Sequence, residues 1–168
     1  IDVITLKSRY PQGAEKMLVY SITGRKIPPG KLPLDVGVVV MNVNSVSFIS
    51  EYLKTGMPLI KRRVTVDGSA VKNPANVEVL IGTRLEDVFN FCGGFDRVVH
   101  KVLMGGPMMG IAQYSLNTSV VKQTNALLAF AREDADIDAE SVCIRCGRCV
   151  KACPMNLMPL FINHNVLK

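Results

Sequence analysis

Apolar residues fall into runs and alternations that predict strands along much of this chain. Residues 3–6 form a short apolar run and residues 36–41 a longer one, as in strands buried on both faces of a sheet. Residues 63–67 alternate and end in Asp67-Gly68, which indicates a hairpin. Further strands are predicted over residues 76–82 and 97–104, with a mixed strand signal over 119–130.

Helical periodicity follows a predicted turn at residues 10–13. It indicates a helix over residues 14–23 that ends at Gly24. Four of its side chains are expected to point inward: Met17, Leu18, Ser21 and Ile22. A second helix is expected to start at a cap, Asn44 or Ser45, and to run to about residue 54.

A third helix is predicted between the strands of the middle region. Thr83 and Glu86 have the spacing of a capping box, and the glycines at 93–94 should stop the helix after Cys92. Cys92 is interpreted as a small core residue, and His100 as a structural residue within a strand. Two strands, one helix and further strand in succession predict a β-grasp module, so the fold class is α+β.

Two loops and a last helix complete the pattern. Residues 105–110 (GGPMMG) lack the ending of a phosphate-binding P-loop and predict a tight turn in which methionine fills a gap. Residues 133–140 carry five acids and no base, as in a solvated linker. A short helix is predicted over residues 158–166, with Pro159 in its first turn.

Four of the five cysteines fall within eleven residues, with the spacing C-x2-C-x2-C-x3-C followed by proline. They are Cys143, Cys146, Cys149 and Cys153. This spacing is typical of bacterial iron–sulfur ligation, and thiolates are the soft ligands that such clusters prefer. Gly147 would let the backbone approach the inorganic sulfides, and Pro154 would end the loop and start a helix. A zinc site more often has two separated cysteine pairs, and a disulfide needs an oxidising compartment.

The fourth cysteine leaves two alternatives open. In two-cluster ferredoxins the fourth cysteine of such a run ligates the other cluster, and no second run follows before residue 168. Cys153 therefore either completes its own cluster, or this chain is a fragment that ends before the second run. The first residue, Ile1, where a complete protein would begin with Met, also suggests an excised piece.

Length and charge narrow the class of protein. The 168 residues suit one or two small domains, and 48% hydrophobic content is ample for a core. The net charge of +6 is uneven, because residues 143–168 carry four bases and no acid. A basic rim would steer acidic partners and stabilise a reduced, anionic cluster. Nucleic acid is disfavoured, since Trp and any basic–aromatic pattern are absent. The longest apolar run is too short to cross a bilayer and no targeting segment is visible, so membrane association would come through partner subunits.

Several strings, taken together and in order, resemble the C subunit of the Rnf electron-transport complex. They are residues 10–16 (YPQGAEK), 23–28 (TGRKIP), 35–39 (DVGVV), 105–110 (GGPMMG) and the cysteine run. A related family with similar architecture is the cobalamin reductase of propanediol-utilising microcompartments. The resemblance implies four regions: the end of a flavin- and NADH-binding α/β domain (1–60), a β-grasp, soluble-ligand-binding domain (61–115), connecting strands with an acidic linker (116–139), and the first half of a two-cluster ferredoxin-like domain (140–168).

The same resemblance implies cofactor contacts. The segment that contacts flavin and NADH is similar to Tyr10, Gly13, Ala14 and Glu15, although Ala14 stands where the family has an acid. The loop that contacts the flavin phosphate is similar to residues 41–45, where Asn42 and Ser45 match in type and residues 41 and 44 do not. Cys143, Cys146 and Cys149 would hold the first [4Fe–4S] cluster, and Cys153 would serve the second.

The function implied is that of a membrane-associated NADH:ferredoxin oxidoreductase subunit, which passes electrons between NADH, FMN and two [4Fe–4S] clusters. The cofactors carry the chemistry, so no catalytic side chain is expected. Expected partners are ferredoxin, NADH and other Rnf-type membrane subunits, on the cytoplasmic face of the bacterial membrane. The alternatives are a non-catalytic docking or ligand-binding piece of that subunit, and a cobalamin reductase.

Overall fold

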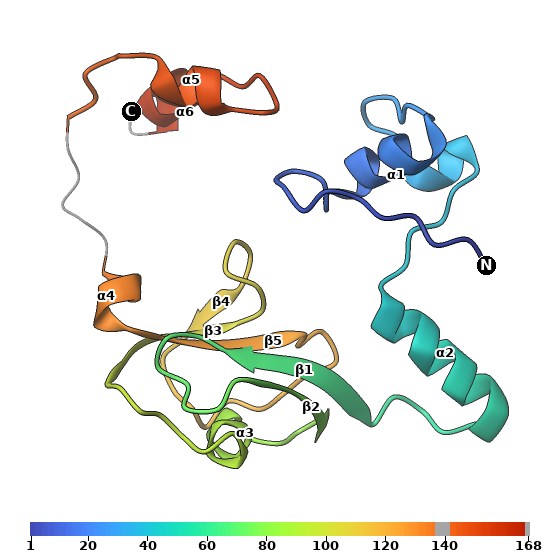
Figure 1. Cartoon of the computed structure of the whole chain (residues 1–168), viewed down its shortest axis with the longest axis vertical. Helices are drawn as coiled ribbons and strands as arrows, with labels where there is room; N and C mark the ends of the chain where they lie inside the picture. Colours follow the sequence, from blue (N-terminus) through green and yellow to red (C-terminus); the bar gives the residue numbers. More distant parts are fainter. Residues whose placement is uncertain (137–141, 167–168) are drawn as a thin grey trace. The chain divides into compact units, whose positions relative to one another are not determined.

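The computed structural model describes residues 1–136 and 142–166. The chain divides into two units, Val43–Asp138 and a second made of Ile1–Asn42 and Ala139–Lys168. Most of the regular structure lies in the first unit, whose sheet is drawn in green, yellow and orange in Figure 1. Asp138 and Glu140 of the acidic stretch and Lys168 of the basic C-terminal part lie outside the described residues.

A five-stranded mixed sheet forms the centre of the Val43–Asp138 unit, with the strand order β2-β1-β5-β3-β4. Its strands are β1 (Lys61–Asp67), β2 (Ala75–Leu80), β3 (Val99–Met104), β4 (Ile111–Gln113) and β5 (Ala126–Ala131). β1 and β5 pair in parallel, and the remaining neighbours are antiparallel. Helix α3 (Leu85–Phe91) lies across one face (Figure 1). The predicted β-grasp module is confirmed, and its central strand β5 comes from the segment assigned to connecting strands.

Alternation in β1 explains why one face of the sheet carries the core. Val64 and Val66 are buried, whereas the residues between and beside them are exposed or half-buried. Phe89 of α3 packs into this core and contacts the ring of Phe95, with ring centroids 5.0 Å apart. The predicted burial of Cys92 is confirmed. The sequence pattern therefore found the core face of the module correctly.

The start of α3 differs from the predicted capping box. Arg84 occupies the N-cap position and its side chain makes no cap hydrogen bond. Instead, the Arg84 guanidinium pairs with the Asp87 carboxylate at 2.9 Å. The Thr83 carbonyl accepts a hydrogen bond from the Val120 amide, so the partners of this helix end come from a distant segment. The carboxylate of Asp87 raises the pKa of Arg84 through that hydrogen bond and its charge.

The connection after β1 requires a residue without a side chain. Gly68 has φ of +118°, and a Cβ there would lie 2.1 Å from the Ala129 carbonyl oxygen. The predicted hairpin does form, because β1 pairs antiparallel with β2, but it closes through residues 68–74 rather than a two-residue turn. Gly68 thus permits β1 to pass β5 at close range.

The glycine-rich loop joins β3 to β4 as a tight turn, as predicted. Its two methionines do not fill a gap, because Met108 is 77% and Met109 93% exposed. A Cβ on Gly110 would lie 2.6 Å from the Gly106 carbonyl oxygen, so the loop closes on its own backbone and leaves no internal space. That closure is the physical reason for the correction.

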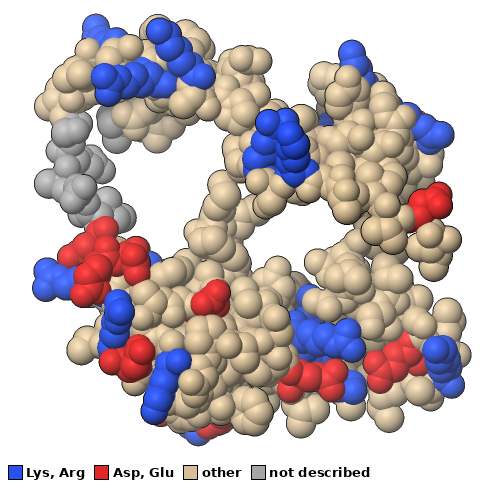
Figure 2. Space-filling model, in the orientation of Figure 1, with Lys and Arg blue, Asp and Glu red and all other residues tan. Residues whose placement is uncertain are grey.

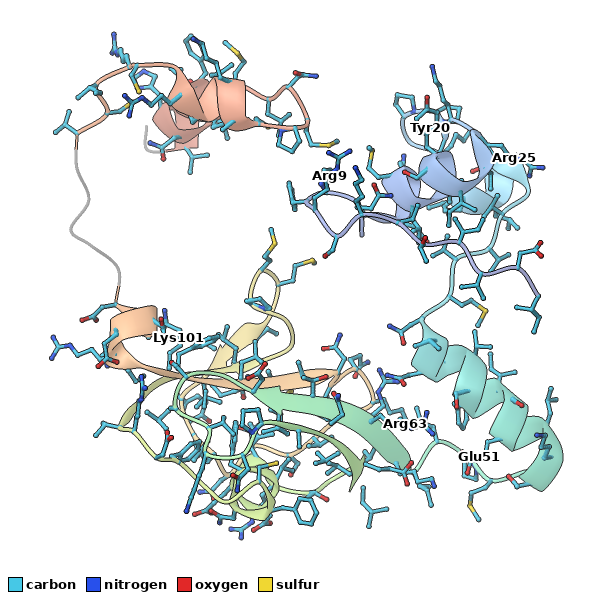
Figure 3. The ribbon with its side chains drawn as sticks, in the orientation of Figure 1. Arg9, Tyr20, Arg25, Glu51, Arg63 and Lys101 are labelled. Carbon is cyan, nitrogen blue, oxygen red and sulfur yellow. The ribbon has the colours of Figure 1, made fainter. Side chains whose placement is uncertain are left out.

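The unit ends in a short helix, α4 (Arg132–Ala135), where a linker was predicted. Lys101 of β3, labelled in Figure 3, donates a hydrogen bond to the Ala135 carbonyl at 3.1 Å. His100 Nε2 lies 3.3 Å from the Asp136 carboxylate, which fits the structural role predicted for this histidine. The remainder of the predicted acidic linker, residues 137–140, lies outside the described part of the chain.

The strands predicted over residues 3–6 and 36–41 are wrong. Residues 1–9 have no regular structure. The start of the second run falls in a 3₁₀ helix, η1 (Pro33–Val36), and the rest of it has no regular structure either. Val3 is 87% and Val39 71% exposed. A strand needs a neighbour for its backbone N–H and C=O groups, and none of the described strands pairs with either segment.

The helix predicted over residues 14–23 is confirmed as α1 (Glu15–Thr23), which ends at Gly24 in the left-handed conformation. Its inward face is shifted from the prediction. Val19 is the buried residue, whereas Ser21 and Ile22 are exposed. Arg25 Nη1 donates to the Val36 carbonyl at 2.7 Å, so contacts with η1 rather than with a sheet decide which face is covered.

Helix α2 (Val43–Thr55) is confirmed, with Gly56 closing it as predicted. It begins two or three residues before the predicted helix, directly after Asn42, so Asn44 and Ser45 lie in its first turn and are not the cap. No residue of α2 is buried. Among the residues that the structure describes, no helix combines the length and apolar character needed to span a bilayer.

Candidate functional site

The cysteine segment, which we define as residues 142–166, holds two helices, α5 (Arg148–Ala152) and α6 (Pro159–Val166). Cys143, Cys146 and Cys149 are exposed, and Cys153 is half-buried. Gly147, with φ of 72°, turns the chain into α5, which carries Cys149. Helix α6 is confirmed where it was predicted.

Pro154 does not start a helix, contrary to the prediction. Helix α5 was not predicted, and it ends at Ala152 with Cys153 at its C-cap. Pro154 follows directly and has no amide hydrogen with which to continue the helix. The proline therefore separates α5 from the turn that leads to α6.

One sulfur of the run already has a polar contact. The Leu157 amide donates a hydrogen bond to Cys153 Sγ at 3.4 Å. The other three thiols face solvent, and across residues 1–136 and 142–166 no three Cys, His, Asp or Glu side chains stand close enough together to hold a metal ion. The run is thus a set of accessible donors placed on one loop, a turn of helix and its C-cap.

The donor set fits an iron–sulfur cluster by its chemistry. Four thiols in a row are soft ligands once deprotonated, and a loop with left-handed residues can let backbone amides approach sulfur. Arg145, Arg148 and Lys151 are exposed beside them. Figure 2 shows blue Lys and Arg atoms and no red Asp or Glu atoms on the visible face of this segment. Positive charge at this rim favours an anionic cluster held by the run.

The residues expected to contact flavin and nicotinamide lie at the starts of two helices. Tyr10 and Gly13 belong to the turn before α1, Ala14 is its N-cap and Glu15 its first residue. Tyr10 is 65% exposed, and no atom comes within 4 Å of a Cβ placed on Gly13. Each helix start presents backbone N–H groups, which favour an anionic group such as phosphate.

The second predicted contact set surrounds the start of α2. Asn42 immediately precedes the helix and is exposed, whereas Ser45 lies in the first turn and is half-buried. A helix N-terminus presents backbone N–H groups that favour an anion, and Asn42 and Ser45 stand at that end of α2.

A cavity of about 360 Å³ lies between α2 and the start of β1. Lys61 Nζ sits 3.0 Å from Glu78 and 3.7 Å from Glu51, and Arg63 Nη1 lies 3.4 Å from Ser47 Oγ. Glu51 and Arg63 are labelled in Figure 3. A hydrogen bond from Lys61 to Glu78, with the charges of both acids, raises the pKa of Lys61. These side chains already form ion pairs and hydrogen bonds with one another, so they do not indicate a bound ligand in the cavity.

Besides helix α5, sequence reasoning missed two features of the cysteine segment. Arg145 and Asn156 both adopt positive φ, 57° and 54°, although neither is glycine. It also missed the Leu157 amide as a donor to sulfur. The available signal was Asn156 itself, because asparagine is several-fold enriched in the left-handed region.

Three family models match the chain in order. The Nuo51 FMN-binding domain matches residues 1–51, the SLBB domain matches residues 63–112, and the 4Fe-4S binding domain matches residues 139–157. The last match contains all four cysteines of the run. The predicted order of a flavin-binding part, a β-grasp part and a ferredoxin-type part is therefore confirmed.

Curated relatives share this order along nearly the whole chain. The C subunit of a proton-translocating ferredoxin:NAD(+) oxidoreductase complex from Clostridium ljungdahlii is 47% identical over 163 residues, which is 97% of this chain and 36% of the relative. Its Na(+)-translocating counterpart from Acetobacterium woodii is 48% identical over 162 residues, 96% of this chain and 37% of the relative. The C subunit of an ion-translocating oxidoreductase complex from Rhodobacter capsulatus is 42% identical over 159 residues, 95% of this chain and 31% of the relative. The chain thus spans about a third of the length of these relatives.

Proposed function

Because this chain belongs to the family of the C subunits of Rnf-type, ion-translocating ferredoxin:NAD(+) oxidoreductase complexes, we propose that it is part of an electron-transfer subunit. The whole protein would move electrons between NADH and ferredoxin. The observation that carries this proposal is the cysteine run inside the match to the 4Fe-4S binding domain, downstream of a flavin-binding match.

The cysteines have separate roles in this proposal. Cys143, Cys146 and Cys149 hold one [4Fe–4S] cluster, since they lie on one loop and the first turn of α5. Cys153, at the C-cap of α5, ligates a second cluster whose other ligands come from outside this chain. When bound, the flavin would exchange electron pairs for single electrons, and the clusters would carry single electrons.

The helix starts position the flavin and nicotinamide in the proposal. Asn42 and Ser45 place polar side chains and backbone N–H groups of α2 at the flavin phosphate. Tyr10, Gly13, Ala14 and Glu15 face the flavin and NADH at the start of α1. Only one acid is present there, because Ala14 replaces the second, so Glu15 is the carboxylate available to NADH.

The proposed partners follow from the same family assignment. Ferredoxin approaches the cysteine segment, whose exposed bases Arg145, Arg148 and Lys151 attract an acidic protein. Other subunits of the complex anchor the protein at the cytoplasmic face of the bacterial membrane. Mutating a base in this rim should therefore slow association with ferredoxin more at low salt than at high salt.

An exchange of segments tests the proposed function. This chain replaces the matching segment of the Acetobacterium woodii protein, and ferredoxin-dependent NAD(+) reduction is measured on the assembled complex. The exchange should keep activity, and Cys146→Ser within it should abolish activity. The matched control is Phe91→Ala, at an exposed position of α3, which should leave activity unchanged. Equal activity of the Cys146→Ser and unaltered exchanges would contradict the proposal.

A second candidate is supported by the exposure of residues 1–42, where Val19 and Pro33 are the only buried residues described. In this view the chain alone is a docking piece without a complete flavin pocket. The two candidates differ in one assay: a flavin-competent chain binds FMN and oxidises NADH with an artificial acceptor, whereas a docking piece does neither.

A further inference from the structure

Two residues other than glycine adopt positive φ in the described chain, and both lie between cysteines of the run or just after its last one. Arg145 has φ of 57° and Asn156 has φ of 54°. Side chains other than glycine enter this region at an energetic disadvantage, and such residues gather where the backbone has a task. The β-grasp module reaches its own left-handed turns with glycine alone.

Asn156 sits in a turn that returns the backbone to the sulfur of Cys153. The Asn156 amide donates to the Cys153 carbonyl at 3.2 Å, which closes the turn. The next amide, that of Leu157, donates to Cys153 Sγ at 3.4 Å. A left-handed residue between these two amides reverses the chain, so that successive N–H groups face the carbonyl and then the side chain of the same cysteine.

We propose that Asn156 is a positioning residue that directs the Leu157 N–H at Cys153 Sγ. The inference rests on the proposed function, in which Cys153 is a cluster ligand. A hydrogen bond to a ligating sulfur favours the more negative, reduced state of a cluster. Asparagine suits the position because it tolerates the left-handed conformation better than other side chains do, and glycine is the natural replacement.

A simpler role for Asn156 would be to close the turn that precedes α6, without influence on sulfur. Both roles require a left-handed residue, but only the positioning role links that conformation to the properties of Cys153. The two are separated by a readout at the sulfur and by rescue with glycine, because glycine keeps the backbone conformation and removes the amide side chain.

The test compares the full chain with Asn156→Gly, Asn156→Ala and Asn156→Val. Asn163→Ala is the control, since Asn163 is an exposed residue of helix α6. In the reduced, metal-free chain, NMR measures hydrogen exchange of the Leu157 amide. In the exchange with the Acetobacterium woodii protein described above, which supplies the other ligands of the second cluster, redox titration after anaerobic loading with iron and sulfide measures the midpoint potential of the cluster that Cys153 ligates.

Slow exchange of the Leu157 amide is expected in the unaltered chain, in Asn156→Gly and in Asn163→Ala. These three proteins should also have the same midpoint potential. Asn156→Val should exchange at the rate of an open peptide and titrate at a more negative potential, with Asn156→Ala between the two. The proposal is overturned if the valine variant matches the unaltered chain in both readouts, or if the glycine variant behaves like the valine variant.

Failure of the proposed function would look different. If none of the proteins takes up iron, Cys153 is not a cluster ligand here and the effect on potential is refuted. Exchange of the Leu157 amide in the metal-free chain then tests the positioning role by itself. Equal exchange rates in all five proteins would overturn this role. Loss of protection confined to the alanine and valine variants would support it.

Discussion

The β-grasp module and the cysteine segment rely on different sources of order. The module buries fourteen residues in one cluster, with Phe89 and Val66 fully covered. None of the described residues of the cysteine segment is buried, and three of its four cysteines face solvent. A hydrophobic core stabilises the first region, whereas the second must gain its stability from ligation, because binding energy and folding energy are linked in metal sites.

Cysteine itself shows the contrast. Cys92 packs within the core of the module, and burial raises the pKa of its thiol. Cys143, Cys146 and Cys149 carry the same side chain in the open. A buried thiol stays protonated and inert, while an exposed one is available as a thiolate ligand. The environment, rather than the residue type, separates the structural cysteine from the candidate ligands.

The largest expected difference between the regions is in thiol reactivity. In the reduced, metal-free chain, an alkylating reagent should modify the three exposed cysteines at the rate of a free peptide. Cys92 should react at least about 10³-fold more slowly, since it becomes accessible only when the module unfolds. Mass spectrometry of timed samples gives the rates. Comparable rates for Cys92 and Cys143 would mean that the module has no stable core.

Removal of a core side chain should affect the module strongly. Phe89→Ala should destabilise it by about 3–5 kcal/mol, because the ring is completely buried against Phe95. Phe91→Ala, two residues along the same helix, removes a ring that is 79% exposed and should change stability by less than about 0.5 kcal/mol. Urea unfolding followed by circular dichroism measures both. Similar losses in the two variants would contradict the core as described.

Crowding between Gly68, directly after β1, and the neighbouring parallel strand β5 should have a smaller effect. Gly68→Ala places a methyl group against the Ala129 carbonyl and should cost about 1–3 kcal/mol. Gly82→Ala is the control, since Gly82 also has positive φ, +98°, but no atom within 4 Å of an added Cβ. The difference between the two unfolding free energies isolates the clash, and equal values would show that Gly68 is required only for its conformation.

The smallest effect is the pH dependence that Cys92 gives the module. Its raised pKa means that the folded state holds the thiol proton more tightly than the unfolded state. The associated stability is therefore complete below the pKa of an unfolded cysteine, about 8.5, and is lost as the pH rises toward the folded value. Cys92→Ala should remove this part of the decline. Parallel stability curves for the two proteins above about pH 9 would refute the assignment.

The same contrast explains what the sequence could predict. The four cysteines of the run lie within eleven residues, so their spacing alone predicted cluster ligation. The strands β1 and β2 were readable because alternation in residues such as Val64 and Val66 reflects one buried face. The run at residues 36–41 was misread, because an apolar run does not state whether a neighbouring strand exists. The cap of α3 was misread because its partner, Val120, is distant in sequence.

The path of the backbone after Cys153 was the other feature that the sequence did not predict. Spacing located Cys153, but it could not show that Pro154 ends a helix or that the Leu157 amide points at sulfur. The direction of the Leu157 amide depends on the left-handed conformation of Asn156, which residue type permits without requiring it. The candidate ligands were thus predictable and their hydrogen bonding was not.

The most direct test of the central claim is the iron and acid-labile sulfide content of the chain, purified without oxygen. If the run ligates a cluster, the chain should hold about four of each, and Cys146→Ser should lose them while circular dichroism of the module stays unchanged. Iron and sulfide near zero in a chain with a folded module would contradict cluster ligation by this run, and would leave the β-grasp scaffold as its only supported role.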